Sequence, residues 1–234
     1  MNILIADDDV ELSQLLKQYL EQENCTVDTV SNGQAAIDLL NKQTFDVLIL
    51  DVMMPQLNGF DTLKTIRLTS DMAVIMLTAK GDMVNRIVGL EMGADDYIAK
   101  PCDPRELIAR IRAVTRRTAP PATTSPTAAD DDTIKLDDVT IMRMSRQVLL
   151  ANENLDFTSA EFDLLLVLID KAGSLVTREM LSKEGLGKRL KRYDRSIDVH
   201  VSNLRKKLGS DSQGRERIKT VHGGGYLYVI YPNE

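Results

Sequence analysis

Short apolar runs alternate with amphipathic segments through the first half of the chain, and this alternation constrains the fold most strongly. The run at residues 45–50 is continuous and largely aliphatic, which is typical of a strand buried on both faces of a parallel sheet. Similar apolar runs occupy residues 2–6, 73–77 and 96–99, and residues 27–30 are expected to form a short strand. The segments between them place apolar residues at helical spacing. Five strand–helix units within residues 1–117 predict a parallel sheet with helices on both faces.

Polar residues stand where four of these predicted strands end. They are Asp7, Asp8, Asp9, Asp51, Thr78 and Lys100. Open parallel sheets place their ligand sites at this edge. A single aspartate here is more often a loop or cap residue, and Thr78 alone could cap a helix. Together, however, the residues describe a phosphoryl site, because a carboxylate nucleophile needs a divalent cation such as Mg²⁺ and a lysine pairs with phosphoryl oxygens.

Charge and composition divide the chain into three segments. Residues 1–117 carry 12 Lys and Arg against 18 Asp and Glu, whereas residues 133–234 carry 17 against 14. Residues 118–132 hold three prolines among small polar residues, which predicts a semi-extended tether. We therefore expect a domain at 1–117, a flexible linker at 118–132 and a second domain at 133–234. A metal-binding module joined to a nucleic-acid binder fits this distribution, although two domains of unrelated charge would also show it.

The second half has a different pattern, with short strands before its helices. A capping-box sequence, Thr158-Ser-Ala-Glu161, predicts the start of a helix. A second helix is expected at 177–182, a third at 194–208, and a glycine-turned hairpin at 221–230. Strands are expected at 134–136, 139–142, 148–151 and 155–157. Two helices followed by a hairpin favour DNA binding.

The 194–208 segment is the candidate DNA-reading helix. Apolar residues occupy one face at helical spacing, and polar or basic residues occupy the other. Asn203 can address adenine and Val199 a thymine methyl, while basic residues can bind phosphates. The commoner alternative is an ordinary surface helix with a solvated basic face. The candidate contacts are Arg195, Val199, His200, Ser202, Asn203, Arg205 and Lys206, with Thr220 and His222 on the hairpin.

Residues 1–117 resemble the receiver domain of two-component response regulators. The matching pieces are Asp7-Asp8, Leu50-Asp-Val-Met-Met-Pro55 with Asn58-Gly59, Leu77-Thr-Ala79, and Gly93-Ala-Asp-Asp-Tyr-Ile-Ala-Lys-Pro101. Residues 133–231 resemble the winged-helix effector domain of the OmpR/PhoB family, most clearly in 193–208 and 218–226. The resemblance implies an α/β, flavodoxin-like (βα)5 receiver domain followed by a winged helix-turn-helix domain. Cys102 departs from the family, which commonly has Phe there, and puts the packing beneath the last receiver helix in doubt.

The resemblance also implies site roles and partners. Asp51 would accept a phosphoryl group from a sensor histidine kinase, while Thr78 and Lys100 would bind it and Thr78 and Tyr97 would act as the switch. Mg²⁺ would be held by Asp7, Asp8, Asp51 and the backbone carbonyl of Met53. The family also suggests a cis Lys100–Pro101 bond. Double-stranded promoter DNA is the expected target, and RNA polymerase is a further candidate partner.

Receivers of this family form homodimers through their fourth and fifth helices when phosphorylated. The charged positions of that interface match three pairs here, each expected across the two-fold axis. The alternative is that these charges form solvated helix faces, since isolated surface ion pairs contribute only about 0–1 kcal/mol. The expected pairs are Arg86 with Glu106, Asp96 with Arg110, and Asp95 with Arg117.

Other classes of protein fit less well. A haloacid-dehalogenase-type phosphatase requires a second acid where Met53 stands, so we do not expect an enzyme. Nucleotide binding is disfavoured because no glycine-rich loop follows a predicted strand. The two cysteines, the absence of a basic leader and the lack of a membrane-length apolar run favour a cytoplasmic protein. Two alternatives stay open: a phosphorylation-independent DNA-binding regulator whose receiver dimerises constitutively, and a phosphotransfer enzyme with a nucleic-acid-binding appendage.

Overall fold

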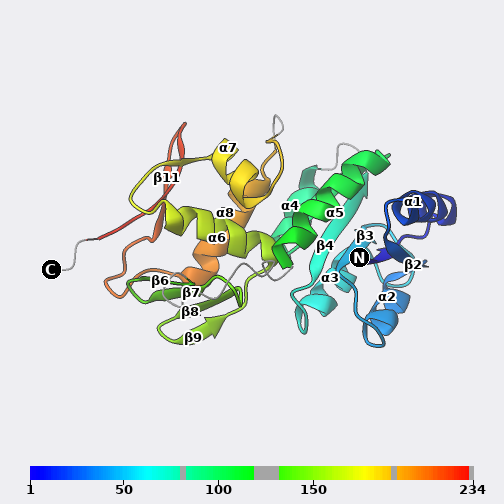
Figure 1. Cartoon of the computed structure of the whole chain (residues 1–234), viewed down its shortest axis with the longest axis horizontal. Coiled ribbons are helices and arrows are strands. Elements are labelled where there is room, and N and C mark those ends of the chain that lie inside the picture. Colours follow the sequence, from blue (N-terminus) through cyan, green and yellow to red (C-terminus); the bar gives the residue numbers. More distant parts are fainter. Residues whose placement is uncertain (80–82, 119–131, 191–193, 232–234) are drawn as a thin grey trace. The chain divides into compact units, whose positions relative to one another are not determined.

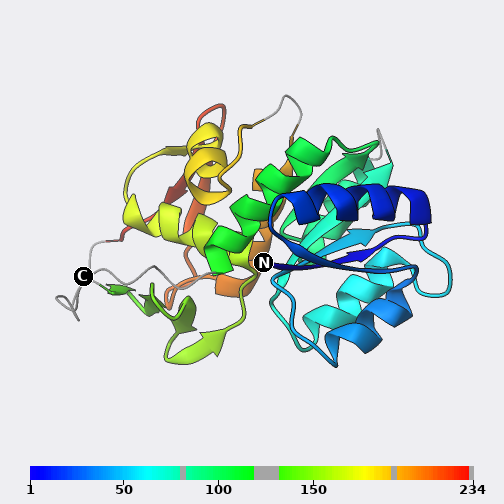
Figure 2. The same ribbon diagram turned by 45° about the vertical axis from the view of Figure 1, so that its right-hand side comes forward.

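The computed structural model describes residues 1–79, 83–118, 132–190 and 194–231; at 83 and 116–118 it describes the backbone alone. The chain separates into two compact units, Met1–Thr118 and Ala119–Glu234 (Figure 1 and Figure 2). The predicted linker at 118–132 lies almost wholly outside the described residues.

The first unit is a five-stranded parallel sheet in the order β2-β1-β3-β4-β5. This is the flavodoxin-like order, in which the site lies where the strand order reverses beside the first strand. The predicted α/β class is confirmed. Its elements are β1 (Asn2–Ala6), α1 (Val10–Gln22), β2 (Thr26–Val30), α2 (Gly33–Leu40), β3 (Val47–Asp51), α3 (Gly59–Arg67), β4 (Ala73–Ala79), α4 (Met83–Glu91), β5 (Asp96–Lys100) and α5 (Pro104–Thr118).

Helices cover both faces of this sheet because successive strand residues point in opposite directions. Ile3 and Ile5 pack in a cluster with residues of α1 and α5. Leu4 and Ala6 pack in a second cluster with residues of α2 and α3. Figure 2 shows α1 and α5 on one side of the sheet and α2 and α3 on the other. Strand β3 is buried along its whole length, as the continuous aliphatic run predicts.

Short polar side chains start the helices next to the carboxyl ends of the strands. Asp9 Oδ1 accepts a hydrogen bond from the Leu12 N–H at 3.0 Å and begins α1. Asn58 Oδ1 accepts one from the Asp61 N–H at 2.9 Å and begins α3. These caps satisfy backbone donors that a helix leaves unpaired, and they fix the loops that surround the predicted phosphoryl site.

The second unit combines an antiparallel four-stranded sheet, a helical core and a three-stranded sheet in the order β10-β12-β11. The hairpin β11–β12 is called the wing below. One apolar cluster joins the sheets to α6 and α8. Its elements are β6 (Thr133–Leu136), β7 (Val139–Met142), β8 (Gln147–Leu150), β9 (Glu153–Leu155), α6 (Ser159–Asp170), β10 (Val176–Thr177), α7 (Arg178–Met180), η1 (Leu181–Gly185), α8 (Ser196–Leu208), β11 (Ile218–Val221) and β12 (Gly225–Tyr228).

Two predicted elements of this unit are corrected, and one strand was missed. The fourth strand lies at Glu153–Leu155, earlier than predicted, because Ala151 and Asn152 have positive φ angles of 51° and 70° and form a tight hairpin turn. The second helix begins at Arg178 and continues as a π-helical turn to Gly185. Strand β10, which pairs with β12, was not predicted. A two-residue strand has too little pattern to detect in a sequence. Among the described residues, no helix is long and apolar enough to cross a membrane.

Arg217 connects separate parts of the second unit and gives its stability a dependence on pH. Its guanidinium, 4% exposed, donates to both carboxylate oxygens of Asp138 at 2.6 and 2.9 Å and to the Ser210 carbonyl at 3.1 Å. The hydrogen bonds from Arg217 hold the pKa of Asp138 below its usual value. A carboxyl with a depressed folded-state pKa stabilises the fold above its unfolded pKa and loses that contribution as pH falls through the folded pKa.

We therefore expect the unit to lose stability as pH falls below about 4, the ordinary aspartate pKa. An Asp138→Asn variant should be less stable at pH 6 and should lose part of this acid dependence. Urea unfolding followed by circular dichroism at pH 6 to 3 measures both effects. Equal acid dependence in the variant and the natural chain would contradict the assignment.

Candidate functional site

Three aspartates meet at the carboxyl edge of the first sheet. Asp7 and Asp8 follow β1, and Asp51 ends the neighbouring strand β3. One carboxylate oxygen from each lies within 4.8 Å of the others. Asp7 and Asp51 are only 1% and 4% exposed, whereas Asp8 is exposed. The cluster therefore joins a buried acidic floor to a solvent-accessible acid.

Lys100, at the end of β5, neutralises this floor. Its ammonium nitrogen lies 2.7 Å from Asp7 Oδ2 and 2.8 Å from Asp51 Oδ1. The other oxygen of Asp51 accepts a hydrogen bond from the Met53 N–H at 3.1 Å. Two buried carboxylates would otherwise carry a large desolvation cost. The lysine thus occupies the position from which a cation would act on Asp51.

Burial sets the protonation behaviour of the site. Burial raises the pKa of Asp51 above its usual value, although the hydrogen bond and the charge of Lys100 oppose the shift. Burial disfavours the Lys100 ammonium, but the hydrogen bonds to Asp51 and Asp7 outweigh it and raise the lysine pKa. Lys100 therefore stays charged at neutral pH, while Asp51 is a more basic carboxylate than an exposed aspartate.

Thr78 supplies a hydroxyl that is ready for a new acceptor. Thr78 lies in β4 and pairs with Ala99 of β5, and the preceding residue, Leu77, pairs with Asp51 of β3. The side chain is 1% exposed, and among the described residues its hydroxyl has no hydrogen-bond partner. A buried, unsatisfied hydroxyl is costly and uncommon. An incoming phosphoryl oxygen would satisfy it. Tyr97 of β5 is half-buried, and the Arg86 guanidinium lies 4.7 Å from its ring centroid.

The donor set fits Mg²⁺, because this ion takes carboxylate oxygens and keeps open positions for water and phosphate. Asp7, Asp8 and Asp51 supply such oxygens within one cluster. The position two residues after Asp51, where a phosphatase would need a second acid, is occupied by Met53, whose side chain is 72% exposed. The ligand roles of these aspartates and of the Met53 carbonyl stay predictions.

Gly59 holds the acidic edge against α3, and sequence reasoning did not assign it this role. A methyl group built there would lie 2.1 Å from the Asp51 carbonyl oxygen. The Gly59 N–H donates to the Val52 carbonyl at 3.0 Å. The signal in the sequence was Asn58-Gly59, which marks a turn but does not show a close backbone approach.

Four of the six charged residues predicted to pair across a dimer, namely Asp95, Asp96, Glu106 and Arg110, have ion-pair partners within the chain. Arg110 binds Asp96 and Glu106, each at 2.6 Å. Burial is the largest single influence on the Arg110 pKa and lowers it. The charges and hydrogen bonds of Asp96 and Glu106 together outweigh burial, so the Arg110 pKa is raised above its usual value. The side chain of Arg117 lies outside the described residues. The interchain pairs stay predictions.

Arg67 is a second residue that sequence reasoning missed, and it is the intrachain partner of Asp95. Its guanidinium lies 3.1 Å from Asp95 Oδ2 and donates to the carbonyls of Ser70, Met72 and Gly93. The same Asp95 oxygen accepts from the Val74 N–H at 2.9 Å. Asp95 therefore forms part of a buried network that joins the end of α3 to the start of β5.

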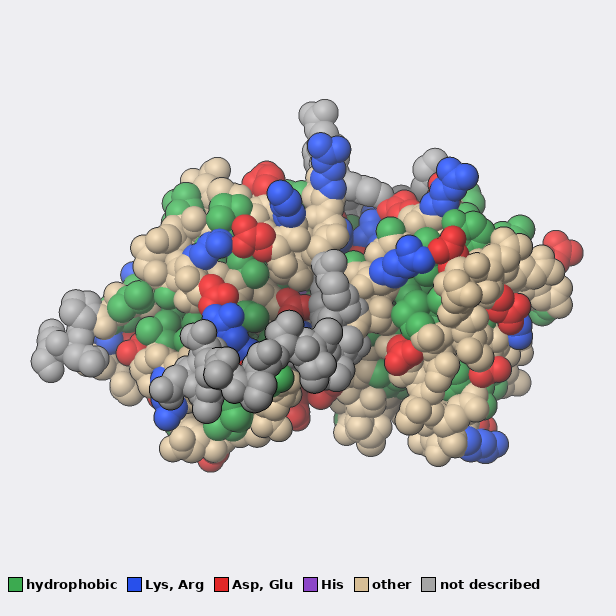
Figure 3. Space-filling view, viewed as in Figure 1, with side chains coloured by type: hydrophobic (Ala, Val, Ile, Leu, Met, Phe, Trp, Pro, Cys, Tyr) green, Lys and Arg blue, Asp and Glu red, His purple; other side chains and the backbone are tan. Residues whose placement is uncertain are grey.

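The predicted DNA-contacting residues fall into two groups. Arg195, Lys206, Thr220 and His222 are exposed, and Ser202 and Arg205 are partly exposed. Val199, His200 and Asn203 are at most 7% exposed in this structure, although Val199 is outside the apolar cluster that buries Ile197, Val201, Leu204 and Leu208. On the visible face of each unit, basic side chains are interspersed with acidic ones (Figure 3). The individual DNA contacts stay predictions.

Comparisons with known proteins agree with this arrangement. Residues 3–112 match the family described as response regulator receiver domain, and residues 152–228 match the family described as transcriptional regulatory protein, C terminal. The chain is 45% identical to the transcriptional regulatory protein CpxR of Escherichia coli over 97% of both chains. It is 43% identical to a CpxR homologue of Haemophilus influenzae, covering 97% of this chain and 98% of the relative.

Solved structures show the same two-part architecture. A point mutant of RitR superposes with a TM-score of 0.75 at 25% identity, covering 98% of this chain and 99% of that chain. The response regulator DrrB of Thermotoga maritima, an OmpR/PhoB homologue, gives a TM-score of 0.50 at 30% identity over 97% and 98% of the two chains.

The family resemblance is therefore confirmed, and so is a likeness to CpxR that is visible in Leu186-Gly-Lys-Arg-Leu190 and Asp51-Val-Met-Met-Pro55. Two family matches, a relative of 45% identity over nearly the whole chain, and a parallel sheet with an acidic edge all agree. The chain belongs to the OmpR/PhoB family of response regulators, transcription regulators that join a receiver domain to a DNA-binding domain.

Proposed function

We propose that phosphorylation of Asp51 by a sensor histidine kinase activates this regulator, which then dimerises through the α4 and α5 face of the receiver and binds repeats in promoter DNA. One observation carries the proposal. The buried Asp51 carboxylate is bound by a lysine at 2.8 Å and belongs to an acidic cluster suited to a divalent cation. The buried Thr78 hydroxyl is available to a new acceptor.

Each residue of the site is proposed to have a separate role in phosphoryl transfer. An oxygen of Asp51 attacks the phosphorus of the kinase's phosphohistidine, the phosphorus–nitrogen bond breaks, and the kinase imidazole leaves. The neighbours Asp7 and Asp8 with the Met53 carbonyl would hold Mg²⁺. The ion, when bound, neutralises the carboxylate and the phosphoryl oxygens. Lys100 already lies between Asp7 and Asp51, so it can turn toward the phosphoryl group as that group forms a bond to Asp51. The Thr78 hydroxyl would donate a hydrogen bond to a phosphoryl oxygen.

The product is a stored signal, and the exposed Met53 supports storage over rapid turnover. Hydrolysis would need a base to activate water beside the phosphoryl group, and a thioether cannot serve as one. The stored group acts on the α4, β5 and α5 face, where Arg86 contacts the ring of the proposed switch residue Tyr97. Dimerisation raises the effective concentration of two DNA-binding domains on paired half-sites. RNA polymerase is the proposed partner downstream of DNA binding.

The proposal is tested by treating the full chain with a small-molecule phosphodonor and Mg²⁺. Mass spectrometry should show one phosphoryl group per chain, and sedimentation should show a shift from monomer to dimer. Dimers of equal stability before and after treatment would favour the constitutive-dimer alternative. Release of many equivalents of phosphate per chain would favour the enzyme alternative.

Charge reversal at Arg86 should weaken the phosphorylated dimer. In Arg86→Glu, the side chain that is proposed to meet Glu106 of the partner copy becomes acidic, and the two symmetric contacts become repulsive. We expect the dimer dissociation constant, measured by sedimentation equilibrium, to rise at least about tenfold, the equivalent of about 1.4 kcal/mol.

Arg112→Glu is the matched control for this reversal. Arg112 lies on α5, is 61% exposed and pairs with Glu23, so it is outside the proposed interface. The control should dimerise as the natural chain does. Equal dissociation constants for Arg86→Glu and Arg112→Glu would show that the Arg86 charge belongs to a solvated helix face.

A further inference from the structure

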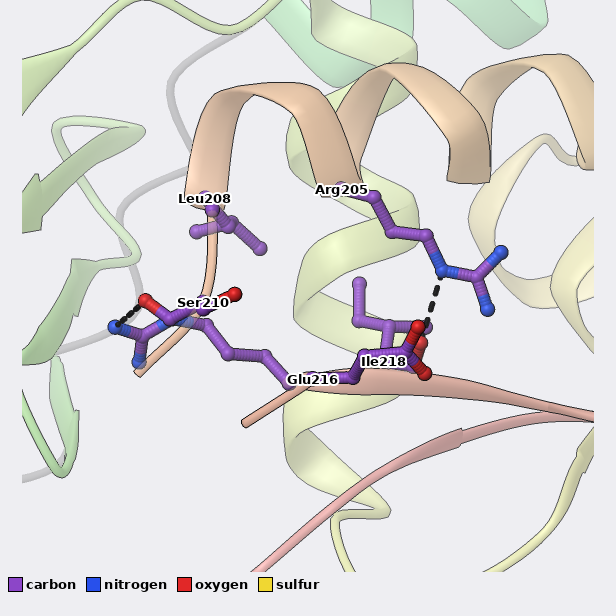
Figure 4. Close-up of a pocket in the computed structure, with 7 residues that line it drawn as sticks. Arg205, Leu208, Ser210, Glu216 and Ile218 are labelled. Carbon is purple, nitrogen blue, oxygen red and sulfur yellow. Dashed lines mark hydrogen bonds between the residues drawn. The ribbon is translucent and has the colours of Figure 1, made fainter. Parts of the chain in front are cut away.

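Arg205 has a role that the sequence did not suggest. It lies on α8, the candidate DNA-reading helix, and was predicted to contact DNA. Its guanidinium instead reaches the wing: Nε donates to the Ile218 carbonyl at 2.9 Å (Figure 4), and Nη2 donates to Thr220 Oγ1 at 2.8 Å. Both acceptors belong to β11. The fork of the guanidinium is therefore used within the protein.

Helix α8 also contacts the second strand of the wing, β12, through Tyr226. The Tyr226 hydroxyl donates a hydrogen bond to Asp198, which also binds Arg178 at 2.8 Å. The guanidinium carbons of Arg178 and Arg205 lie 5.1 and 5.7 Å from the Tyr226 ring centroid. Burial, followed by the bond to Asp198, raises the Tyr226 pKa to about 12, so the hydroxyl stays protonated at neutral pH. Asp198 and Arg205 stand two turns apart on α8, and each holds one strand of the wing.

Apolar packing does little to fix β11 against α8. Only Ile218 of this strand is buried, and the next three residues are exposed. A pocket of about 220 Å³ lies between the end of α8 and the start of β11, lined by residues that include Arg205, Leu208, Arg217 and Ile218 (Figure 4). A gap removes dispersion contacts between the surfaces that line it. The distance between β11 and α8 therefore depends on polar contacts, of which those of Arg205 bridge the gap directly.

We propose that Arg205 is a positioning residue, which sets the wing against the DNA-reading helix so that both bind DNA as one rigid surface, and that it does not contact a phosphate itself. This inference rests on the proposed DNA-reading role of α8 and the wing. Arginine suits the task because its planar fork donates to two acceptors at once, whereas a lysine ammonium is a single point charge on a flexible stem.

A lysine substitution separates positioning from direct contact, because it keeps the charge and removes the fork. The full chain would be titrated onto a random-sequence DNA duplex between about 50 and 200 mM salt, since binding to the phosphate backbone of DNA is strongest at low salt. If Arg205 positions the wing, Arg205→Lys and Arg205→Gln should both bind at least about threefold more weakly than the natural chain. If Arg205 binds a phosphate, Arg205→Lys should bind as the natural chain does. In that case only Arg205→Gln should weaken binding, with a salt slope smaller by about 0.9.

Hydrogen exchange in the free protein gives a readout that does not need DNA. Amides of the wing strands β11 and β12 should exchange faster in Arg205→Lys and in Arg205→Gln than in the natural chain. Thr220→Val, which keeps the side-chain shape but removes one acceptor, should show the same change and serves if the Arg205 variants do not fold. Lys206→Gln is the control: Lys206 is exposed and adjacent, and its change should lower the salt slope but leave wing exchange unchanged.

The two readouts assign each outcome. Natural affinity in Arg205→Lys, or natural wing exchange in Thr220→Val and every folded Arg205 variant, would overturn the positioning role. A natural chain that does not bind the duplex at any salt concentration would contradict the DNA-reading role instead, and the exchange rates would still decide whether Arg205 fixes the wing.

Discussion

Asp51→Asn is expected to abolish covalent phosphorylation by a small-molecule phosphodonor in the presence of Mg²⁺. The amide has almost the same shape as the carboxylate, but it lacks the negative oxygen that attacks phosphorus. It also removes one acid from the three that cluster within 4.8 Å. Asp7 also binds Lys100, but it follows β1, whereas Asp51 ends β3. Intact-mass measurement should therefore show the full gain of one phosphoryl group in the natural chain and none in the variant.

Asp9→Asn is the matched control, because it makes the same chemical change in the same acidic run. Asp9 caps α1 through Oδ1, and an asparagine caps a helix equally well. The control should keep its fold and gain the phosphoryl group. Asp8→Asn should be phosphorylated more slowly and should need more Mg²⁺, since Asp8 is proposed to bind the ion. A phosphoryl gain in Asp51→Asn as large as in the natural chain would place the acceptor elsewhere.

The fold of the receiver could be predicted from the sequence because each residue pattern there has one structural explanation. A continuous aliphatic run can be satisfied only by burial on both faces, and this identified β3 correctly. Polar residues directly after such runs must lie on one edge of a parallel sheet, so Asp7, Asp51 and Lys100 were brought together as expected. Short strands of the second unit were harder, because β9 and β10 hold two or three residues and depend on turns and pairing for their position.

Other features could not be predicted because they depend on distances across the fold. The ions Asp95 and Arg67 are separated by 28 positions in the chain, and neither carries a local pattern that names the other. A basic residue on a helix looks alike in sequence whether it points to DNA or to a neighbouring strand. Arg205 shows the second case.

Gly59→Ala is expected to damage the receiver and its phosphoryl site together. The added methyl carbon would lie 2.1 Å from the Asp51 carbonyl oxygen and 2.9 Å from the Val52 Cα. Both neighbours are backbone atoms, so no side chain can rotate away. Either α3 or the end of β3 must move. Overpacking typically costs about 1–3 kcal/mol, and the backbone here has little freedom to relax. We therefore expect the free energy of unfolding to fall by about 3 kcal/mol or more.

Gly89→Ala is the control that makes this result specific. Gly89 also lies in a helix of the receiver, but its added methyl would meet the flexible end of Met76, the sulfur atom, at 2.7 Å. Met76 can move, and alanine favours a helix over glycine by up to about 1 kcal/mol, so the net change should be small. Native-state hydrogen exchange of the β3 amides measures the folding stability of both variants. Phosphorylation by the small-molecule donor should be lost only in Gly59→Ala. If the two variants have equal stability and equal phosphorylation, the close approach of α3 to Asp51 is not what holds the acidic edge in place.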